Sequence, residues 1–389
     1  MSYLKFQADN IFTGTEMLDS NKILVTNEKG IIEDIIDESE AGQDVQQFKG
    51  IISPGFINCH CHLELSHLKG MIPEQTGMVD FILNILQKRF SPEEMIQDAI
   101  EKAEDEMIEN GIVAVGDICN TTNTINQKKK GRLYYQNFVE VSGFVPQFAQ
   151  QRFDAGKEVY NEFIKHFPNT TTIVPHAPYS VSNNLFGLIS DASHNKISTI
   201  HNQESKEENE FFMQGNGDFT RLYKNLGIDI SFFNKAGKSS IAIVSEHFLK
   251  NAKTILVHNT FTSQTDIDFL NKEFTKTQFY FCLCVLANRY ITNSFPSEVL
   301  LNKNFNNIVL GTDSLASNHT LNILSEIQVM KDNYSFLSQF DLLQFATYNG
   351  ALALNIEDKY GSFKRGKQPG IILIEDLFYS KKIINLNLK

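Results

Sequence analysis

The sequence contains no tryptophan, and its 5 cysteines are an odd number without regular spacing. Such a set argues against a disulfide framework and favours a reducing compartment. No apolar run reaches the roughly 18 residues that cross a bilayer. The first residues also lack the apolar segment of a signal peptide. The sequence therefore predicts a cytoplasmic protein with no membrane partner.

Positive charge is in the minority. Lys and Arg number 35 against 46 Asp and Glu, which gives a formal net charge of −11. An acidic chain repels phosphate backbones, so we expect no nucleic-acid partner. The one short basic run, Lys128-Lys129-Lys130, is interpreted as a solvated loop.

The two ends of the chain share one pattern. Residues 22–26 and 31–36 are strand-like and enclose a turn, and residues 371–374 form a further strand-like run among glycine turns. We expect a single small β domain built from residues 1–52 and 356–389.

The intervening residues 53–355 have a different rhythm, in which short apolar or β-branched runs alternate with helical stretches. One helix is predicted at 93–110, with Ser91 as N-cap, Pro92 as first helical residue and Gly111 after its end. The predicted strands are at 112–115, 173–174, 198–200, 254–257, 278–281 and 308–310. Repeated strand and helix units predict a parallel sheet closed into a barrel.

Histidines and one aspartate follow these strands. His60-Cys61-His62 comes after the apolar run 51–58, and His176, His201, His258 and Asp313 each come after a later run. In a parallel barrel, the carboxyl ends of the strands share one face, where catalytic residues gather. Because side chains alternate along a strand, His60 and His62 lie on the same side.

These residue types indicate a metal site. His60 and His62, completed by His201 and Asp313, give the His and carboxylate ligands of a catalytic zinc ion. Nitrogen and oxygen ligands leave iron or manganese possible. Glu204 lies close enough to His201 to carry protons to and from an activated water without being a ligand.

Some residues next to these candidates are interpreted without a metal-binding or catalytic role. Cys59 and Cys61 flank the two histidines, and strand alternation turns them away, so we interpret them as small buried hydrophobes rather than ligands. Residues 205–208 are interpreted as a solvated helix start, which leaves Glu207 and Glu208 without a role.

Several motifs together resemble the amidohydrolase superfamily, in its chlorohydrolase and deaminase branch. The motifs span nearly the whole chain: 54–62 for the first strand, 175–182 for the fourth, His201 with Glu204, His258-Asn259, 311–314, and the tail segments 349–354 and 361–367. The resemblance implies a (β/α)8 TIM barrel with a small β-sandwich domain formed from both termini. It also implies a small-molecule substrate and, weakly, a homodimer.

The resemblance further implies one divalent metal ion, most simply Zn²⁺ with Fe²⁺ as the alternative. Binuclear relatives carry a carboxylated lysine on the fourth strand, where this chain has His176. Asp313 would accept a proton from the attacking water, His258 would orient that water, and Glu204 would protonate a ring nitrogen before ammonia leaves. His176 would contact the substrate.

Two segments bear on the substrate. Residues 62–66 resemble those of aminodeoxyfutalosine deaminases, which suggests that Glu64 binds substrate; the alternative is that residues 63–65 only begin a helix. The segment 282–288 departs from the Cys-Pro-x-Ser-Asn pattern of the branch, which puts any substrate role there in doubt. An aminated purine or a similar ring is the preferred substrate class.

Three other functions stay open. A ring-opening amidohydrolase resembling imidazolonepropionase would release no ammonia, and a chlorohydrolase would release chloride. A metal-binding protein without catalysis is disfavoured, because a structural ion needs a closed ligand set and no adjacent Glu204.

Overall fold

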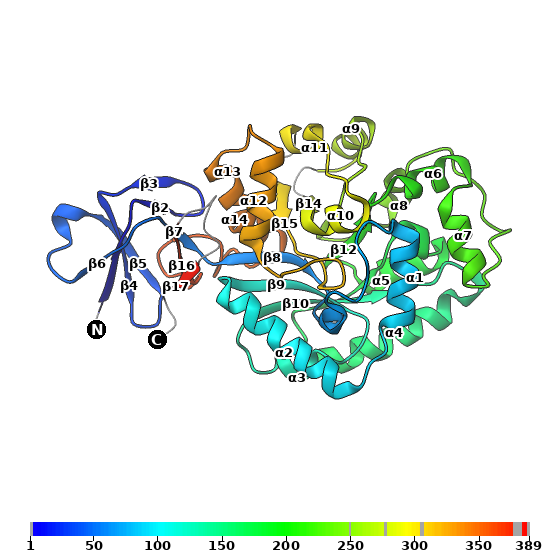
Figure 1. Ribbon diagram of the computed structural model, residues 1–389, viewed down its shortest axis with the longest axis horizontal. Helices are drawn as coiled ribbons and strands as arrows, with labels where there is room; N and C mark the ends of the chain where they lie inside the picture. Colours follow the sequence, from blue (N-terminus) through cyan, green and yellow to red (C-terminus); the bar gives the residue numbers. More distant parts are fainter. Residues whose placement is uncertain (1–2, 249, 276–277, 304–306, 376–382, 387–389) are drawn as a thin grey trace.

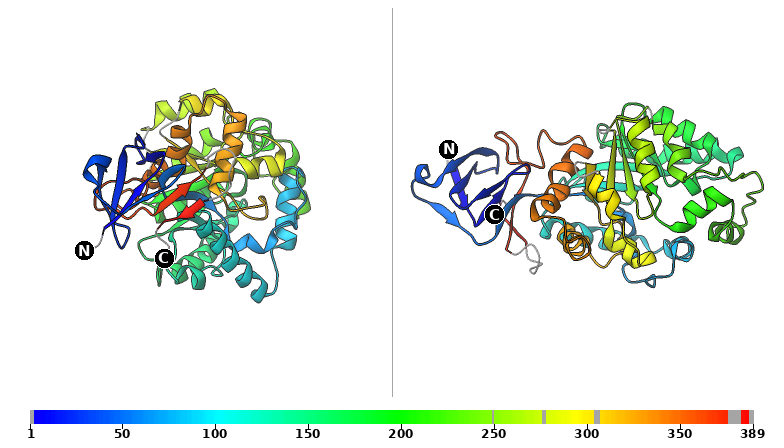
Figure 2. Two further views of the ribbon diagram at one scale, coloured as in Figure 1. Left: turned by 60° about the vertical axis from the view of Figure 1, so that its left-hand side comes forward. Right: turned by 90° about the horizontal axis from the view of Figure 1, so that it is seen from above.

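The described part of the chain comprises residues 3–248, 250–275, 278–303, 307–375 and 383–386 of this computed structural model. It folds into two lobes (Figure 1), and the second view of Figure 2 separates them clearly. The smaller lobe holds strands from the beginning and the end of the described chain and the 3-10 turn at Glu38–Glu40. The larger lobe holds all the α-helices.

The smaller lobe consists of two sheets, in the strand orders β5-β4-β1-β6 and β17-β16-β7-β2-β3. Its strands are β1 (Tyr3–Gln7), β2 (Asn10–Phe12), β3 (Met17–Asp19), β4 (Lys22–Asn27), β5 (Ile32–Asp37), β6 (Val45–Gln47), β7 (Ile51–Pro54), β16 (Ile371–Ile374) and β17 (Ile383–Asn385). The predicted strands at 22–26, 31–36 and 371–374 all form.

Strand β7 joins the two ends of the sequence. It pairs antiparallel with β16, placing Ile52 opposite Leu373, and both side chains are buried with Phe6, Ile11 and Leu24. Strand β8 follows β7 after one residue and enters the larger lobe. The smaller lobe therefore fixes the start of the strand that carries His60.

Eight parallel strands form the centre of the larger lobe, in the orders β11-β10-β9-β8 and β12-β13-β14-β15. They are β8 (Phe56–Cys61), β9 (Ile112–Cys119), β10 (Tyr134–Val141), β11 (Thr171–Pro175), β12 (Ile197–Asn202), β13 (Lys253–His258), β14 (Phe279–Leu283) and β15 (Ile308–Leu310).

The two sheets meet at both edges. Cys61 and Asp313 form a parallel bridge, and the amide of His201 donates to the carbonyl of His176 at 2.9 Å. This mixed α/β arrangement is that of a TIM-barrel-type fold.

Helices lie outside these strands (Figure 1), mostly in the connections between them. The α-helices are α1 (Met78–Lys88), α2 (Glu93–Glu109), α3 (Ile125–Lys128), α4 (Ala149–Ile164), α5 (Asn183–Ala192), α6 (Lys206–Gln214), α7 (Asp218–Asn225), α8 (Ser240–Val244), α9 (Gln264–Glu273), α10 (Val285–Thr292), α11 (Glu298–Lys303), α12 (Ile323–Asn333), α13 (Gln339–Ala346) and α14 (Tyr348–Ala353). The 3-10 turns are η1 (Glu38–Glu40), η2 (Leu63–Leu68), η3 (Pro146–Phe148), η4 (Pro178–Ser180) and η5 (Ser245–Phe248). No helix of the described residues is long and apolar enough to cross a membrane.

The predicted helix at 93–110 forms as α2, but its start differs. Pro92 occupies the N-cap with an extended backbone (ψ 138°) and no side-chain cap, so the expectation of a Ser91 cap was wrong. The helical hydrogen bonds begin one residue later than predicted. Gly111 follows the end with φ +76°, a conformation that glycine adopts without strain.

Strand β10 was not among the predicted strands. Its run contains Gln136, Asn137 and Glu140, which interrupt the apolar pattern although all three are buried. Period-two hydrophobicity identifies a strand only where the buried face is apolar. This strand carries polar groups inward because it borders the site described below.

Lys128 corrects a second expectation, because it is buried rather than solvated. Its ammonium lies 2.6 Å from Asp117 Oδ2 and 2.8 Å from Asn137 Oδ1, with both charged side chains fully enclosed. A buried charge requires such partners, and removing one of them leaves the other uncompensated. The basic run is therefore divided, with its first residue anchored in the core.

Candidate metal centre and active site

The predicted polar residues converge at the carboxyl ends of the parallel strands. His60 and His201 lie near the ends of β8 and β12, His258 ends β13, and Asp313 follows β15. Both His258 (φ 72°) and Asp313 (φ 56°) have left-handed backbones, which are uncommon outside glycine. Strain of this kind clusters at functional sites, where the surrounding structure maintains it.

Four side chains converge on one point. His62 Nε2 lies 3.2 Å from His60 Nε2 and 3.3 Å from His201 Nε2. Asp313 Oδ1 lies 3.5 Å from His60 Nε2 and 3.4 Å from His62 Nε2. Zinc ligands at 2.0–2.1 Å in a tetrahedron are separated by about 3.3 Å, so this spacing fits a metal ion. The four residues could therefore hold one.

The charge states also suit metal binding. Burial lowers the pKa of His62 to about 3, and it lowers that of His201 well below its ordinary value. Burial alone would raise the pKa of Asp313, but the hydrogen bond from His60 and the charges of the other imidazoles hold it well below the usual range. Neutral imidazoles and an ionised carboxylate are the forms that bind metals.

Two further contacts fix the orientation of these side chains. His201 Nδ1 lies 2.9 Å from the carbonyl oxygen of His176, and the Ser317 hydroxyl donates to Asp313 Oδ2 at 2.5 Å. Each contact occupies the atom that faces away from the cluster. Such outer contacts select the tautomer and the orientation of a metal ligand.

Glu204 and His258 face each other beside the cluster. Glu204 Oε1 lies 3.3 Å from His258 Nε2, and His258 Nδ1 lies 2.8 Å from Asn288 Oδ1. Burial, followed by the charge of Asp313, raises the pKa of Glu204 well above its ordinary value. Burial lowers the pKa of His258 to about 4. A carboxyl group with a raised pKa therefore lies beside an imidazole with a lowered pKa.

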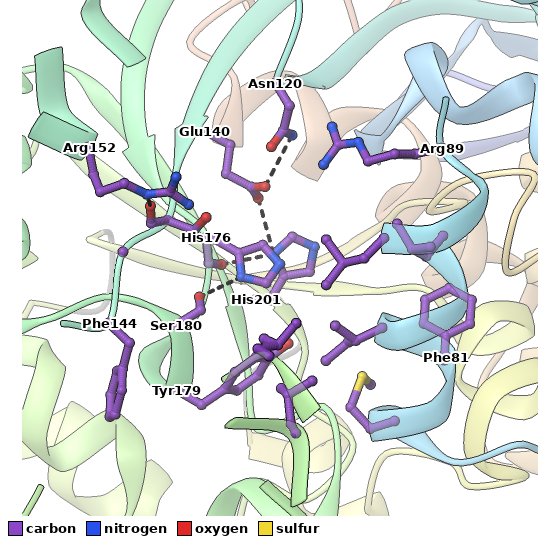
Figure 3. A pocket seen from close by; sticks show the side chains of 18 of the residues that line it. Phe81, Arg89, Asn120, Glu140, Phe144, Arg152, His176, Tyr179, Ser180 and His201 are labelled. Atoms are coloured by element: carbon purple, nitrogen blue, oxygen red, sulfur yellow. Dashed lines mark hydrogen bonds and ion pairs between the residues drawn. The ribbon is translucent and has the colours of Figure 1, made fainter. Parts of the chain in front are cut away.

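A cavity of about 720 Å³ opens from this cluster. His62, His201 and Asp313 lie at its inner end with Glu204, and apolar side chains of α1 and α7 line the outer part. Figure 3 shows Arg89 and Arg152 on opposite sides in this view, with Asn120 and Glu140 between them. An apolar cavity with a few convergent polar groups is typical of a small-molecule site.

The two predicted substrate-binding residues both line the cavity. His176 Nδ1 lies 2.6 Å from the Ser180 hydroxyl. Glu64 lies in η2, so it belongs to a helical turn and to the cavity wall at once. Its carboxylate accepts hydrogen bonds from the Thr121 amide at 2.8 Å and hydroxyl at 2.6 Å, which engages it in the wall.

Two residues of the site were missed by the sequence analysis. Asn288 lies in the segment 282–288 whose role was in doubt, and it contacts His258 rather than the cavity. Glu140 lies next to the end of the unpredicted strand β10, and burial raises its pKa to about 7. Only the β-branched and aromatic residues around Glu140 could have indicated it, since they mark a strand whose end faces the site.

Among the residues interpreted without a role in the site, the two cysteines agree with the expectation and Glu208 does not. Cys59 and Cys61 are buried, and burial raises the pKa of both thiols well above the ordinary value, as expected for small hydrophobes. The segment 205–208 does begin a helix, but Glu208 is buried rather than solvated. Its carboxylate accepts a hydrogen bond from the Gln203 amide at 3.1 Å, next to Glu204.

A sequence profile described as the amidohydrolase family matches residues 51–387. The chain belongs to the amidohydrolase family. The resemblance drawn from the motifs is confirmed, and so is the enzyme class, a hydrolase of C–N bonds. Members of this family are metal-dependent, which agrees with the clustered ligands.

Curated relatives of this amidohydrolase are named as deaminases. A 5-methylthioadenosine/S-adenosylhomocysteine deaminase from Teredinibacter turnerae is 25% identical over 343 residues, covering 84% of this chain and 72% of that protein. An aminodeoxyfutalosine deaminase from Nitratiruptor sp. is 24% identical over 343 residues, covering 84% of this chain and 79% of that protein.

Solved structures share the fold. The aminofutalosine deaminase of Helicobacter pylori in complex with methylthio-coformycin has a TM-score of 0.80 at 21% identity, covering 97% of this chain and 94% of that one. An adenosine deaminase from Xanthomonas campestris with bound zinc has a TM-score of 0.73 at 18% identity, covering 98% and 90%.

Proposed function

We propose that this amidohydrolase deaminates an adenine-type nucleoside, exchanging the amino group of the ring for oxygen and releasing ammonia. The observation that carries the proposal is the position of Glu204. Its carboxyl group lies 3.3 Å from His258 and beside the four clustered side chains, in surroundings that raise its pKa. The curated relatives are named as deaminases of adenine nucleosides.

His60, His62, His201 and Asp313 are proposed to hold one divalent ion, Zn²⁺ or Fe²⁺. Their mutual spacing supports tetrahedral coordination with zinc distances. A bound ion would supply a lowered pKa for the attacking water. The lowered pKa values of His62, His201 and Asp313 support the same assignment.

The remaining roles follow from the contacts. Glu204 gives its proton to the ring nitrogen next to the amino-bearing carbon, since a buried carboxyl with a raised pKa is a proton donor near neutral pH. Neutral His258 directs Nε2 toward Glu204 and the attacking water. Asp313 receives the proton that the water loses. Asp313 passes this proton to the amino group, which leaves the tetrahedral carbon as ammonia, and the remaining hydroxyl proton returns to Glu204 as the carbonyl forms.

The cavity supports a substrate larger than a free base. Its volume of about 720 Å³ extends from the cluster to an apolar outer part. A purine at the inner end would leave that outer part for the sugar and its substituent. His176 and Glu64 are proposed to contact substrate from the cavity wall.

The finer architecture belongs to the same proposal. Residues 53–355 form a closed (β/α)8 barrel, supported by the Cys61–Asp313 bridge and the hydrogen bond from His201 to His176. Residues 1–52 and 356–389 form one β-sandwich domain, supported by the β7–β16 pairing. A cytoplasmic location and a homodimer stay predictions, which fractionation and light scattering would test.

An ammonia-release assay tests the activity. The panel is adenosine, 5′-deoxyadenosine, 5-methylthioadenosine, S-adenosylhomocysteine and aminodeoxyfutalosine, with guanine and a chlorinated triazine for comparison. We expect ammonia from at least one adenine nucleoside. Chloride release from the triazine, or hydrolysis of a lactam ring without ammonia, would instead establish one of the two alternative hydrolase activities.

A further inference from the structure

The two ring nitrogens of His201 face different surroundings. Nε2 lies 3.3 Å from His62 Nε2, within the cluster of ligands, whereas Nδ1 lies 2.9 Å from the carbonyl oxygen of His176. A nitrogen that binds a metal uses its lone pair, so the imidazole hydrogen resides on the other nitrogen. In the metal-binding form, His201 Nδ1 is therefore a hydrogen donor that points away from the cluster.

A buried carboxylate lies behind this donor. Glu140 Oε2 is 3.5 Å from His201 Nδ1, as the dashed line in Figure 3 shows. Glu140 Oε1 accepts a hydrogen bond from Asn120 Nδ2 at 3.2 Å, which fixes the side chain. Within the described part of the chain, Oε2 has no hydrogen-bond partner, and Glu140 is only 9% exposed. A buried polar atom of this kind requires an explanation.

The hydrogen bond to the His176 carbonyl does not replace the electrostatic effect of the Glu140 carboxylate on His201. It accepts hydrogen bonds from both the amide and the Nδ1 of His201, each at 2.9 Å, which uses both of its lone pairs. At 3.5 Å, the Glu140 oxygen is too far for a strong hydrogen bond. Charges still interact at this distance when water is excluded, so the carboxylate acts on the imidazole electrostatically.

We propose that Glu140 is a positioning residue of the metal centre. Its carboxylate, held by Asn120, maintains the orientation of His201 and increases electron donation by Nε2. Such outer carboxylates commonly support histidine ligands. The inference rests on the proposed function, because it takes the metal ligands from there. It also accounts for a buried acid next to the end of β10.

Two other uses of Glu140 make different predictions. Glu140, His176 and His201 are close enough to form a second metal site. That site would require His201 Nδ1 to give up the His176 carbonyl, and His176 Nδ1 is engaged by Ser180 at 2.6 Å. Alternatively, Glu140 could bind substrate from the cavity wall. Metal affinity and metal stoichiometry separate these uses from a positioning role.

The test compares Glu140→Gln with wild type and with Glu104→Gln. Glu104 is another buried acid, hydrogen-bonded to Tyr135 at 2.9 Å and remote from the cavity, so its variant is the matched control. Zn²⁺ and Co²⁺ affinities are measured by chelator competition, together with the visible spectrum of the Co²⁺ protein and the thermal unfolding of the metal-free protein.

We expect Glu140→Gln to bind metal about tenfold to a hundredfold more weakly, with an altered Co²⁺ spectrum and unchanged unfolding of the metal-free protein. Glu104→Gln should retain wild-type metal affinity. Asn120→Ala, which releases Glu140 without removing its charge, should weaken metal binding by a smaller factor. This second variant keeps the inference testable if Glu140→Gln folds poorly.

Three results would overturn the inference. One is a metal affinity of Glu140→Gln within about twofold of wild type. Another is a raised KM at unchanged metal affinity, which would make Glu140 a substrate contact. The third is two bound ions in wild type and one in the variant. If His62→Ala loses its metal and Glu140→Gln keeps it, the proposed function stands and the inference on Glu140 fails. If the wild-type protein binds no metal, both the inference and the proposed function fail.

Discussion

Asn288 Oδ1 lies 2.8 Å from His258 Nδ1, so the side chain of a short helix determines the tautomer of a histidine on a neighbouring strand. With the hydrogen on Nδ1, the lone pair of Nε2 points to Glu204 at 3.3 Å. The segment 282–288 departs from the pattern of related enzymes, yet its last residue, Asn288, orients the histidine that faces the proposed proton donor Glu204.

Asn288→Ala should lower kcat about tenfold, because loss of one buried hydrogen bond of about 1.4 kcal/mol allows His258 to take the wrong tautomer. Asn288→Asp keeps an acceptor at this position and should retain more activity. Steady-state kinetics with the best nucleoside substrate measures both. Equal activity of Asn288→Ala and wild type would remove Asn288 from the proton path.

Glu204→Gln should reduce kcat by about a hundredfold to ten-thousandfold, the range for loss of a general acid. Metal content should stay unchanged, because Glu204 is not among the clustered ligands. Glu207→Gln, three residues along the same segment, is the control and should behave as wild type. Turnover that survives in Glu204→Gln would refute its role as proton carrier.

Metal removal should abolish activity and lower the unfolding temperature, because an ion that binds only the folded state stabilises it. Elemental analysis of the purified protein should give about one equivalent of zinc or iron, since the proposed catalytic site has one set of ligands. Re-addition of either ion should restore turnover. A stoichiometry near two would contradict the single-ion assignment.

The contribution of Glu326 to stability should fall as the pH rises from about 4.5 toward about 8. Burial raises the pKa of Glu326 to about 8, so the folded state holds a proton that the unfolded state releases earlier. The stabilisation is complete below the unfolded pKa and is lost as the pH passes the folded pKa. Glu326→Gln, which resembles the protonated acid, should reduce this slope by up to about 1.4 kcal/mol per pH unit. Urea unfolding at several pH values measures it.

The cluster of His60, His62, His201 and Asp313 was predictable because these residues follow apolar runs that identify their strands. His201 and Asp313 could be assigned together, although they are far apart in sequence, because parallel strands bring their carboxyl ends to one face. The strand at 308–310 was predicted with the same bounds that it has in the structure.

The misses share one physical cause, which is that polar groups become buried when partners distant in sequence satisfy them. Lys128 was interpreted as solvated and Glu140 was passed over, because only the folded chain reveals Asp117 beside Lys128 and Asn120 beside Glu140. Asn288 escaped notice for the same reason, since His258 lies on another strand. Local patterns identify elements, but they do not identify the partners of buried polar atoms.

The pairing of β7 with β16 has a consequence for protein synthesis. Strand β7 leads directly into the strand of His60, and its neighbour β16 is translated only near the end of the described chain. A growing chain therefore cannot complete this sheet before β16 has emerged, when the barrel strands are already available. Contacts between such distant segments form slowly, and the uncovered edge of β7 is exposed to other chains until then. Emergence of β16, rather than emergence of the histidines and Asp313, should mark the point at which the site acquires its final geometry.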